Sequence, residues 1–312
     1  MCIFIAQCCH MKIYNRPTIT FLLLLIFLKT TSNAQSLDSI KVVAHGAELK
    51  RVANSFAFTE GPAADKAGNI YFTDQPKDDI WKYDTDGRLS LFMHGGGRSN
   101  GLYFDHDGNL IACADEHNEI WSINMDKKKK VLLTNFQGHL LNGPNDLWID
   151  GKGGIYFTDP YYQRDYWTRQ KPEIKEQVYY LPKGKKVPVI VDSTIVKPNG
   201  IVGSPDGKNL FVADIGDSKI YKYDIGDDGK LTNRRLFAPQ GCDGMTLDNQ
   251  GNLYLAGNGV TIYDATGHRV GNIPVPSAWS ANVCFGGKDK DILLITASES
   301  VYTIRMSVKG VE

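Results

Sequence analysis

The segment Asp65-Lys-Ala-Gly-Asn-Ile-Tyr-Phe-Thr-Asp74 combines a Gly-containing turn with a short run of β-forming residues. The same arrangement returns at Asp150-Gly-Lys-Gly-Gly-Ile-Tyr-Phe-Thr-Asp159. Less similar copies stand at residues 105–114, 205–214, 248–256 and 288–296. Gly-containing turns between two strand-like runs are typical of β-hairpins. Six copies at similar intervals form an internal repeat, which is the sequence signature of solenoids and propellers.

Further strand-like runs surround this repeat. One follows each copy, at residues 80–83, 120–123, 178–181, 220–223, 260–263 and 301–304, and a weaker fourth run often comes next, as at Val187–Val191. No long window has the periodicity of an amphipathic helix. Four strands in each unit of about 40–50 residues predict an all-β fold, a six-bladed β-propeller. We expect residues 38–58 to add a strand to the last blade and so close the ring.

The amino-terminal residues 1–34 have the pattern of a secretory signal peptide. Lys12 and Arg16 precede an apolar run at residues 19–28, and small residues follow as far as Ala34. About ten apolar residues are too few for a comfortable membrane span. We expect translation to start at Met11, cleavage to follow Ala34, and the propeller to occupy residues 35–312. The mature protein would then be secreted or periplasmic, with a signal anchor as the alternative.

Charge and cysteine content narrow the function classes. The chain has 35 Lys+Arg and 35 Asp+Glu, so it lacks the basic excess that nucleic-acid binding requires. Loss of residues 1–34 removes three basic residues and no acidic one, which leaves 32 against 35 and a net charge near −3. Three cysteines remain in the mature part, and all are flanked by apolar residues. Their spacing fits neither a disulfide framework nor a zinc site, so we expect buried free thiols at Cys113, Cys242 and Cys284.

Every repeat carries an acidic or amide residue eight positions before its turn. These residues are Glu60, Asn100, Asn145, Asn199, Asp243 and Asn282. Each stands at the start of an innermost strand, so in a propeller the six side chains converge on the central channel. Asn and Asp are poor strand formers, and a polar side chain facing a packed channel is costly without a partner. The alternative is that the Asn-Gly pairs only shape turns.

A ring of oxygen donors suits a hard divalent cation. Ca²⁺ fits best, because it accepts irregular coordination by carboxylates and amide carbonyls. The carboxylates of Glu60 and Asp243 would balance its charge. Zinc is disfavoured by the absence of His and Cys from the ring, although Mn²⁺, Mg²⁺ and Zn²⁺ stay open as alternatives.

One long loop, at residues 160–177, is expected to lie at the same end of the channel. It carries aromatic and cationic side chains, namely Tyr161, Tyr162, Arg164, Tyr166, Trp167 and Arg169. Long loops in compact domains are often lids or binding loops. This composition suits a hydroxylated or anionic small molecule, and a purely structural loop is the alternative.

Six short motifs resemble a known family. They are Thr59-Glu-Gly-Pro62, Leu141-Asn-Gly-Pro-Asn-Asp-Leu147, Thr158-Asp-Pro160, Lys197-Pro-Asn-Gly200, Cys242-Asp-Gly-Met245 and Asn282-Val-Cys-Phe-Gly-Gly287. Over nearly all of residues 50–306 the chain resembles the family of gluconolactonase, regucalcin (senescence marker protein) and luciferin-regenerating enzyme, and more distantly diisopropyl fluorophosphatase. The resemblance implies a six-bladed propeller with a divalent metal in its channel and a metal-dependent hydrolase that opens sugar lactones.

The resemblance also implies roles for individual residues. The metal ligands would be Glu60, Asn145, Asn199 and Asp243, with Asp243 also the general base that activates water. Asn100 would then lie near the substrate. The regucalcin branch has an arginine two residues before the amide ligand of the third blade, where this sequence has Gly143. Substrate contacts are therefore expected from other residues, namely Arg98, Asn142, Tyr161 and Asn282.

Two other functions stay open at this point. One is a phosphotriesterase-type hydrolase that uses the same site. The other is a non-catalytic binding propeller that holds a structural cation. In the favoured interpretation the partner is a small sugar lactone, with no nucleic acid and no membrane once the signal is cleaved.

Overall fold

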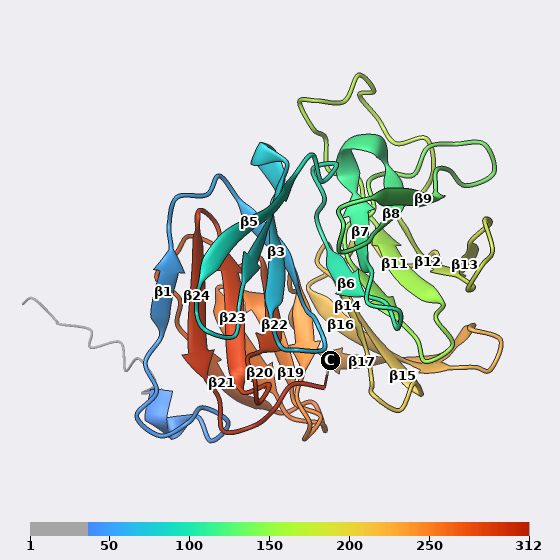
Figure 1. Cartoon of the computed structure of the whole chain (residues 1–312). Coiled ribbons are helices and arrows are strands. Elements are labelled where there is room, and N and C mark those ends of the chain that lie inside the picture. The colour runs from blue at the N-terminus through green and yellow to red at the C-terminus, as the bar shows by residue number, and fades with distance from the viewer. Residues whose placement is uncertain (1–36, 312) are drawn as a thin grey trace, which may run out of the picture. The chain divides into compact units, whose positions relative to one another are not determined.

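Six four-stranded antiparallel sheets make up the fold in the computed structural model, which describes residues 37–311, all within the unit Gln35–Glu312 (Figure 1). The predicted signal peptide and its cleavage site lie outside the described residues. Within the described part, the helices are three short 3₁₀ turns, Leu37–Ser39, Gln75–Lys77 and Asp115–His117. None of them is long or apolar enough to cross a bilayer. The predicted six-bladed propeller is confirmed.

Each of the first five blades is a meander whose four strands pair in chain order. Blades 1 to 3 consist of β2 (Thr59–Ala64), β3 (Ile70–Asp74), β4 (Asp79–Tyr83) and β5 (Leu89–His94); β6 (Leu102–Phe104), β7 (Leu110–Ala114), β8 (Glu119–Ile123) and β9 (Lys129–Leu133); and β10 (Leu147–Ile149), β11 (Ile155–Asp159), β12 (Gln177–Leu181) and β13 (Val189–Asp192). The strand predicted at residues 187–191 thus begins two residues later, after Pro188, whose ring nitrogen has no hydrogen to donate.

The remaining blades follow the same plan. They consist of β14 (Pro198–Gly203), β15 (Asn209–Asp214), β16 (Lys219–Ile225) and β17 (Leu231–Ala238); β18 (Met245–Leu247), β19 (Leu253–Gly257), β20 (Gly259–Tyr263) and β21 (Arg269–Ile273); and β22 (Asn282–Gly286), β23 (Ile292–Ala297) and β24 (Ser300–Arg305), joined by β1 (Lys50–Ala53). In this last blade β1 pairs antiparallel with β24, as Figure 1 shows. Residues 38–58 therefore close the ring as expected.

The repeated turn has a simple local cause. The Asp65 carboxylate accepts hydrogen bonds from the backbone N–H groups of Ala67 and Asn69, at 3.0 and 2.9 Å between N and Oδ1. The first aspartate of three other repeats does the same, at Asp105, Asp150 and Asp248. A short acidic side chain that satisfies its own turn favours this geometry over strand or helix. The turn motif is therefore a local folding signal, and the ring residues lie at the opposite end of the strand that precedes it.

Candidate functional site

The six predicted ring residues take equivalent places at the entry to the innermost strands. Three of them lie within the first two residues of their strands, Glu60 in β2, Asn199 in β14 and Asn282 in β22. The other three stand two residues before theirs, Asn100 before β6, Asn145 before β10 and Asp243 before β18. Five of the six are buried, and Asp243 is partly exposed. The six residues therefore lie where the sequence repeat predicts, at the entry to the innermost strand of each blade.

Glycines after the ring residues let neighbouring inner strands approach each other closely. A glycine follows four of the six, at positions 61, 101, 200 and 244. The N–H of Gly200 donates to the carbonyl oxygen of Asp243 over 2.7 Å, and a Cβ at Gly200 would lie 2.3 Å from that oxygen. A Cβ at Gly244 would lie within 1.9 Å of the Asn282 carboxamide. Because these glycines have no side chain, the inner strands can approach closely enough to bring the ring residues together.

Two ring carboxylates repel each other in the channel. Burial and the neighbouring Asp243 carboxylate raise the pKa of Glu60 well above its ordinary value, although the N–H of Gly61 donates to it. Burial likewise raises the pKa of Asp243 to about 6, against the indole N–H of Trp279, which donates to its Oδ2 over 2.7 Å. The pKa of both acids stays raised although the Arg164 guanidinium lowers it, so this cation offsets their negative charge only in part. The pair therefore fits a bound cation.

A third channel carboxylate, Asp146, is missing from the sequence prediction. It stands where four other blades have glycine, and its Oδ2 lies 3.5 Å from the Nδ2 of Asn282. Burial raises the pKa of Asp146 to about 7, although the backbone N–H of Leu147 donates to it. Glycine follows the ring residue in four other blades, whereas Asp146 follows Asn145. This break in the pattern is the sequence feature that could have identified Asp146.

The ring side chains that could bind a cation offer carboxylate and amide oxygens as ligands. Within residues 37–311 no group of three or more His, Cys, Asp or Glu side chains comes close enough to hold a metal ion. A cation in the channel would therefore depend on amide oxygens as well as on the carboxylates of Glu60 and Asp243. Mixed amide and carboxylate oxygens suit Ca²⁺ better than zinc or copper. The three cysteines of the described part are buried, as expected.

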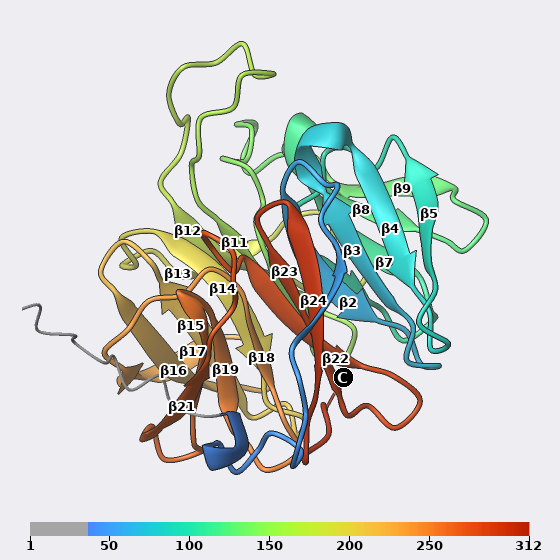
Figure 2. The same cartoon turned by 90° about the vertical axis from the view of Figure 1, so that its left-hand side faces the viewer.

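The long loop between β11 and β12 extends beyond the sheets at one end of the blades (Figure 2). Its hydrogen bonds connect it to several blades. Lys197, just before β14, donates to the Tyr161 carbonyl over 3.1 Å, and the Nδ2 of Asn199 donates to the Tyr162 hydroxyl over 3.1 Å. The Arg164 guanidinium lowers the pKa of both Glu60 and Asp243. This loop, called the lid below, therefore brings Tyr162 and Arg164 to the ring.

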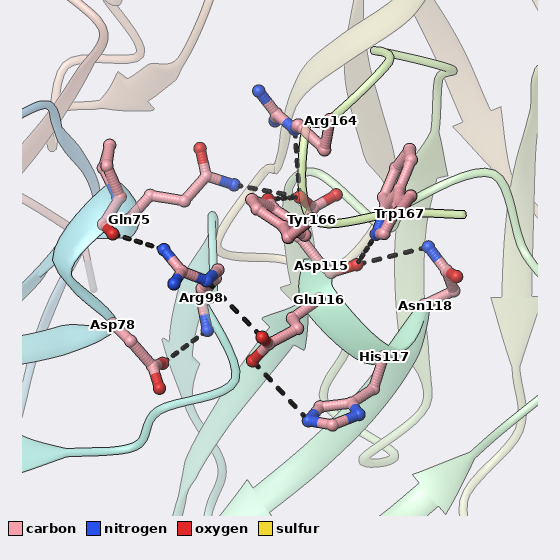
Figure 3. A network of polar contacts seen from close by, with 11 residues as sticks. Gln75, Asp78, Arg98, Asp115, Glu116, His117, Asn118, Arg164, Tyr166 and Trp167 are labelled. Atoms are coloured by element: carbon pink, nitrogen blue, oxygen red, sulfur yellow. Dashed lines mark hydrogen bonds and ion pairs between the residues drawn. The ribbon is translucent and has the colours of Figure 1, made fainter. Parts of the chain in front are cut away.

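Asp115 of blade 2 is the main attachment point of the lid (Figure 3). Its Oδ2 accepts the Nε–H of Arg164 over 3.0 Å and the Tyr166 hydroxyl, and it lies 3.3 Å from the Nε2 of Gln75. The indole of Trp167 donates to the Asp115 carbonyl over 3.0 Å. The Asp115 side chain is almost fully buried, and this raises its pKa despite the neighbouring cation of Arg164.

Asp115 stands one position after an aspartate that recurs in other blades. Asp74, Asp159 and Asp214 end the second strands of their blades, and each accepts hydrogen bonds from two or more backbone N–H groups near the start of its own blade. In blade 2 that position is Ala114, and the carboxylate comes one residue later, at Asp115, where it faces side chains of the lid. The acidic residue at this end of blade 2 therefore holds the lid and not its own blade.

The remaining predicted substrate residues lie around the ring and the lid. Asn282 and Asn100 belong to the ring itself. Asn142 is fully buried, and its Nδ2 donates to the carbonyls of Asp159 and Lys175, so it fixes the base of the lid. Arg98 lies 4.9 Å from the Tyr166 ring, at the outer side of the lid. The Tyr161 hydroxyl donates to Gln163 within the loop, so Tyr162, and not Tyr161, reaches the ring.

Comparison with known proteins places this site in a family. A family model described as "SMP-30/Gluconolactonase/LRE-like region" matches residues 58–299. The chain belongs to the SMP-30/gluconolactonase/LRE-like family. The resemblance seen in the sequence motifs is therefore confirmed.

Members of the SMP-30/gluconolactonase/LRE-like family and related proteins are similar over most of their length. The chain is 29% identical to a gluconolactonase of Zymomonas mobilis, over 90% of this chain and 87% of that protein. It is 26% identical to the diisopropyl-fluorophosphatase of Loligo vulgaris, over 66% of this chain and 74% of that protein. Among solved structures, a gluconolactonase from Xanthomonas campestris superposes with a TM-score of 0.79 at 26% identity, over 85% of this chain and 91% of that one.

The attachment of the lid gives one testable prediction. We expect Asp115→Asn to raise KM for the substrate roughly tenfold, because the buried carboxylate that orients Arg164 and Tyr166 is lost. The lid contains Arg164, Arg169 and Lys171, so the variant should also be cleaved faster there by trypsin. Glu116→Gln is the matched control, since Glu116 is adjacent but pairs with Arg98 and His117 outside the lid. Equal tryptic cleavage of the lid in both variants would contradict the assigned role.

Asp159 gives a prediction for the pH dependence of stability. Burial raises its pKa from an ordinary 3.8 to about 7, although the N–H groups of Asn142 and Gly143 donate to it. The folded state therefore binds a proton more tightly than the unfolded state, so the contribution of Asp159 to stability falls as pH rises from about 4 to about 7. The full change is roughly 4 kcal/mol. Denaturant unfolding of the wild type and of Asp159→Asn should differ in this pH slope, whereas parallel slopes would contradict it.

Proposed function

We propose that this chain is a lactone hydrolase that opens a sugar lactone at the ring end of the propeller channel. The observation that carries the proposal is the similarity to a gluconolactonase across nine tenths of this chain. The site is chemically consistent with it, because buried carboxylates, amides and a phenol converge beneath an aromatic and cationic lid. A few converging polar groups of this kind suit a small neutral or hydroxylated substrate.

A divalent cation, most favourably Ca²⁺, belongs to this proposal. Glu60, Asn145, Asn199 and Asp243 would hold it, and the mutual repulsion of the two buried carboxylates supports this assignment. When bound, such a cation polarises the lactone carbonyl and stabilises the negative charge that develops on it.

The side chains of the chain supply the remaining steps. Asp243, held by the Trp279 indole, accepts a proton from the water that attacks the lactone carbonyl. The ring-opened product then leaves as an aldonate with its new hydroxyl protonated. Asn100 and Asn282 face the substrate hydroxyls, while the lid places Tyr162, whose hydroxyl accepts from Asn199, and Arg164, held by Asp115, over the ring. The lid limits the access of bulk water to this step.

A hydrolysis panel tests this proposal. Purified protein should open aldonolactones at rates well above their spontaneous hydrolysis, lose this activity with a chelator, and recover it with Ca²⁺. Aryl phosphotriesters form the second arm of the panel, since a fluorophosphatase is among the relatives. Turnover of phosphotriesters alone would replace the proposed function. A chelator-dependent thermal shift without turnover of any substrate would indicate a binding propeller.

The assignment of the general base has its own test. We expect Asp243→Asn to reduce kcat by about a hundredfold or more, because the proton acceptor is lost. Asp146→Asn is the comparison, since Asp146 is also a buried channel carboxylate with a raised pKa. Metal content is measured in both variants. If Asp243→Asn retained its metal and its turnover while Asp146→Asn lost turnover, the base would be Asp146.

A further inference from the structure

A cavity lies away from the ring, between blades 2 and 3. It has a volume of about 590 Å³. Its walls come from the turns at residues 105–109 and 153–155 and from the outer hairpins at residues 124–132 and 181–186. These turns stand at the far ends of the inner strands, since β10 runs from near Asn145 to Ile149 before the turn begins. The cavity, called the lysine groove below, is thus separate from the candidate lactone site.

Six lysines line the groove. They come from two facing hairpins, Lys128, Lys129 and Lys130 from the β8–β9 hairpin and Lys183, Lys185 and Lys186 from the β12–β13 hairpin. All six are exposed. Across the described part of the chain, no ion pair joins any of these lysines to an acidic side chain. The whole chain has zero formal net charge, so this is a local concentration of positive charge.

The two carboxylates in the groove do little to neutralise the positive charge of its lysines. Asp105 is engaged in its turn, where it accepts the backbone N–H groups of Asp107 and Asn109 and the Asn109 side chain. Asp107 is exposed at the rim. The Lys129 ammonium lies over the Trp121 ring, 3.7 Å from its centroid, which leaves five other lysines against two carboxylates. The groove therefore keeps an unbalanced positive field, which favours an anionic ligand.

The remaining lining indicates what kind of anion fits. The lining is aliphatic apart from its polar side chains: Val131 is exposed, and Ile111, Ile149, Ile155 and Leu181 beneath it are almost fully buried. No Phe, Tyr, Trp or Arg side chain lines the groove, and the Nε2 of its histidine, His106, lies 3.0 Å from the Asp150 carbonyl oxygen. Single-stranded nucleic acids are usually held by aromatic stacking, and bidentate contacts to phosphate need arginine. A flat lipid surface cannot reach a recessed floor. Lysines act as hydrated point charges and suit carboxylates that are spaced along a flexible chain.

We propose that the lysine groove binds a linear polyuronate, a polysaccharide with one carboxylate on each sugar. The carboxylates lie against the two lysine rows, and the C–H faces of the sugar rings cover Val131 and the aliphatic stems of the lysines. The cavity holds a few sugars, so neighbouring sugars extend along the hairpins. This interaction does not depend on the proposed lactonase activity, because the groove shares no residue with the ring or the lid.

Calorimetric titration with galacturonate oligomers of increasing length tests the proposal. Affinity should increase from the monomer to the hexamer and should fall with added salt, since the screening length shrinks from about 10 Å at 0.1 M to about 3 Å at 1 M. The triple variant Lys128→Gln, Lys185→Gln, Lys186→Gln should weaken hexamer binding about tenfold or more. The control variant Lys41→Gln, Lys50→Gln, Lys208→Gln carries the same charge change on exposed lysines outside the groove and should bind as the wild type does.

Lactone turnover and the thermal midpoint are measured in both variants, to show that each is folded. Equal weakening of binding in both variants would overturn the proposal, since it would reflect net charge alone. No binding of the hexamer by the wild type would also overturn it. Tighter binding of single-stranded DNA or of phosphatidylglycerol vesicles than of the hexamer would assign the groove to that other polyanion.

Discussion

Glu60→Gln is expected to lower lactone hydrolysis by about a hundredfold or more while making the metal-free protein more stable. Glutamine keeps the shape of the side chain but removes one of two buried carboxylates that repel each other. Without a cation, that repulsion disfavours the folded state, and its removal is worth on the order of 1 kcal/mol. With Ca²⁺ present, the wild type should be the more stable of the two proteins, because it gains binding energy that the variant lacks.

The measurement is thermal unfolding at pH 8, with chelator and with Ca²⁺, alongside lactone turnover. Because the pKa of Glu60 is raised in the folded state, the stability of the metal-free wild type falls as pH rises, and the advantage of the variant should grow with it. Glu48→Gln, at an exposed position, is the control and should change neither quantity. Full activity in Glu60→Gln would remove Glu60 from the proposed metal site.

Gly200→Ala is expected to destabilise the fold by about 3 kcal/mol or more. A Cβ at this position would lie 2.3 Å from the carbonyl oxygen of Asp243 and 3.0 Å from the Cα of Gly244. Both atoms belong to the backbone of the next blade, so relief requires two inner strands to separate. The ring would widen, and lactone turnover should fall together with stability.

Gly151→Ala is the matched control for this substitution. Gly151 also lies outside the left-handed region, and a Cβ there meets nothing within 4 Å. We expect it to be neutral or to stabilise by a few tenths of a kcal/mol, through the smaller conformational freedom of the unfolded chain. Urea unfolding of both variants measures the difference, and equal stabilities would contradict the close approach of the inner strands.

The sequence was sufficient to predict the architecture because the repeat is local. Each turn aspartate satisfies its own turn, so the copies are recognisable without knowledge of their neighbours. The same periodicity located Glu60 and the other ring residues, since a fixed offset from the turn marks a fixed depth in the channel. The closing strand was also predictable, because four-stranded blades need one more strand than residues 282–305 provide.

Residues whose role depends on distant partners were harder to predict. Asp115 falls one position beyond the place that Asp74 and Asp159 take in the repeat, and its partners come from a loop about fifty residues later. Tyr161 and Tyr162 are adjacent in the lid, and only the folded loop shows which hydroxyl approaches Asn199. Asp146 directly follows the ring residue Asn145, so a repeat with one polar residue in each blade does not include it. These cases depend on tertiary contacts that no repeat encodes.

The pairing of β1 with β24 also has a consequence for biosynthesis. These strands share a blade although almost the whole chain separates them, so the circle is completed only after the ribosome has released residues 300–305. Until then the incomplete sixth sheet and the first blade face water along surfaces that later pack together, which makes the nascent chain prone to aggregation. Premature termination anywhere before β24 should therefore yield an insoluble product and not a shorter working enzyme.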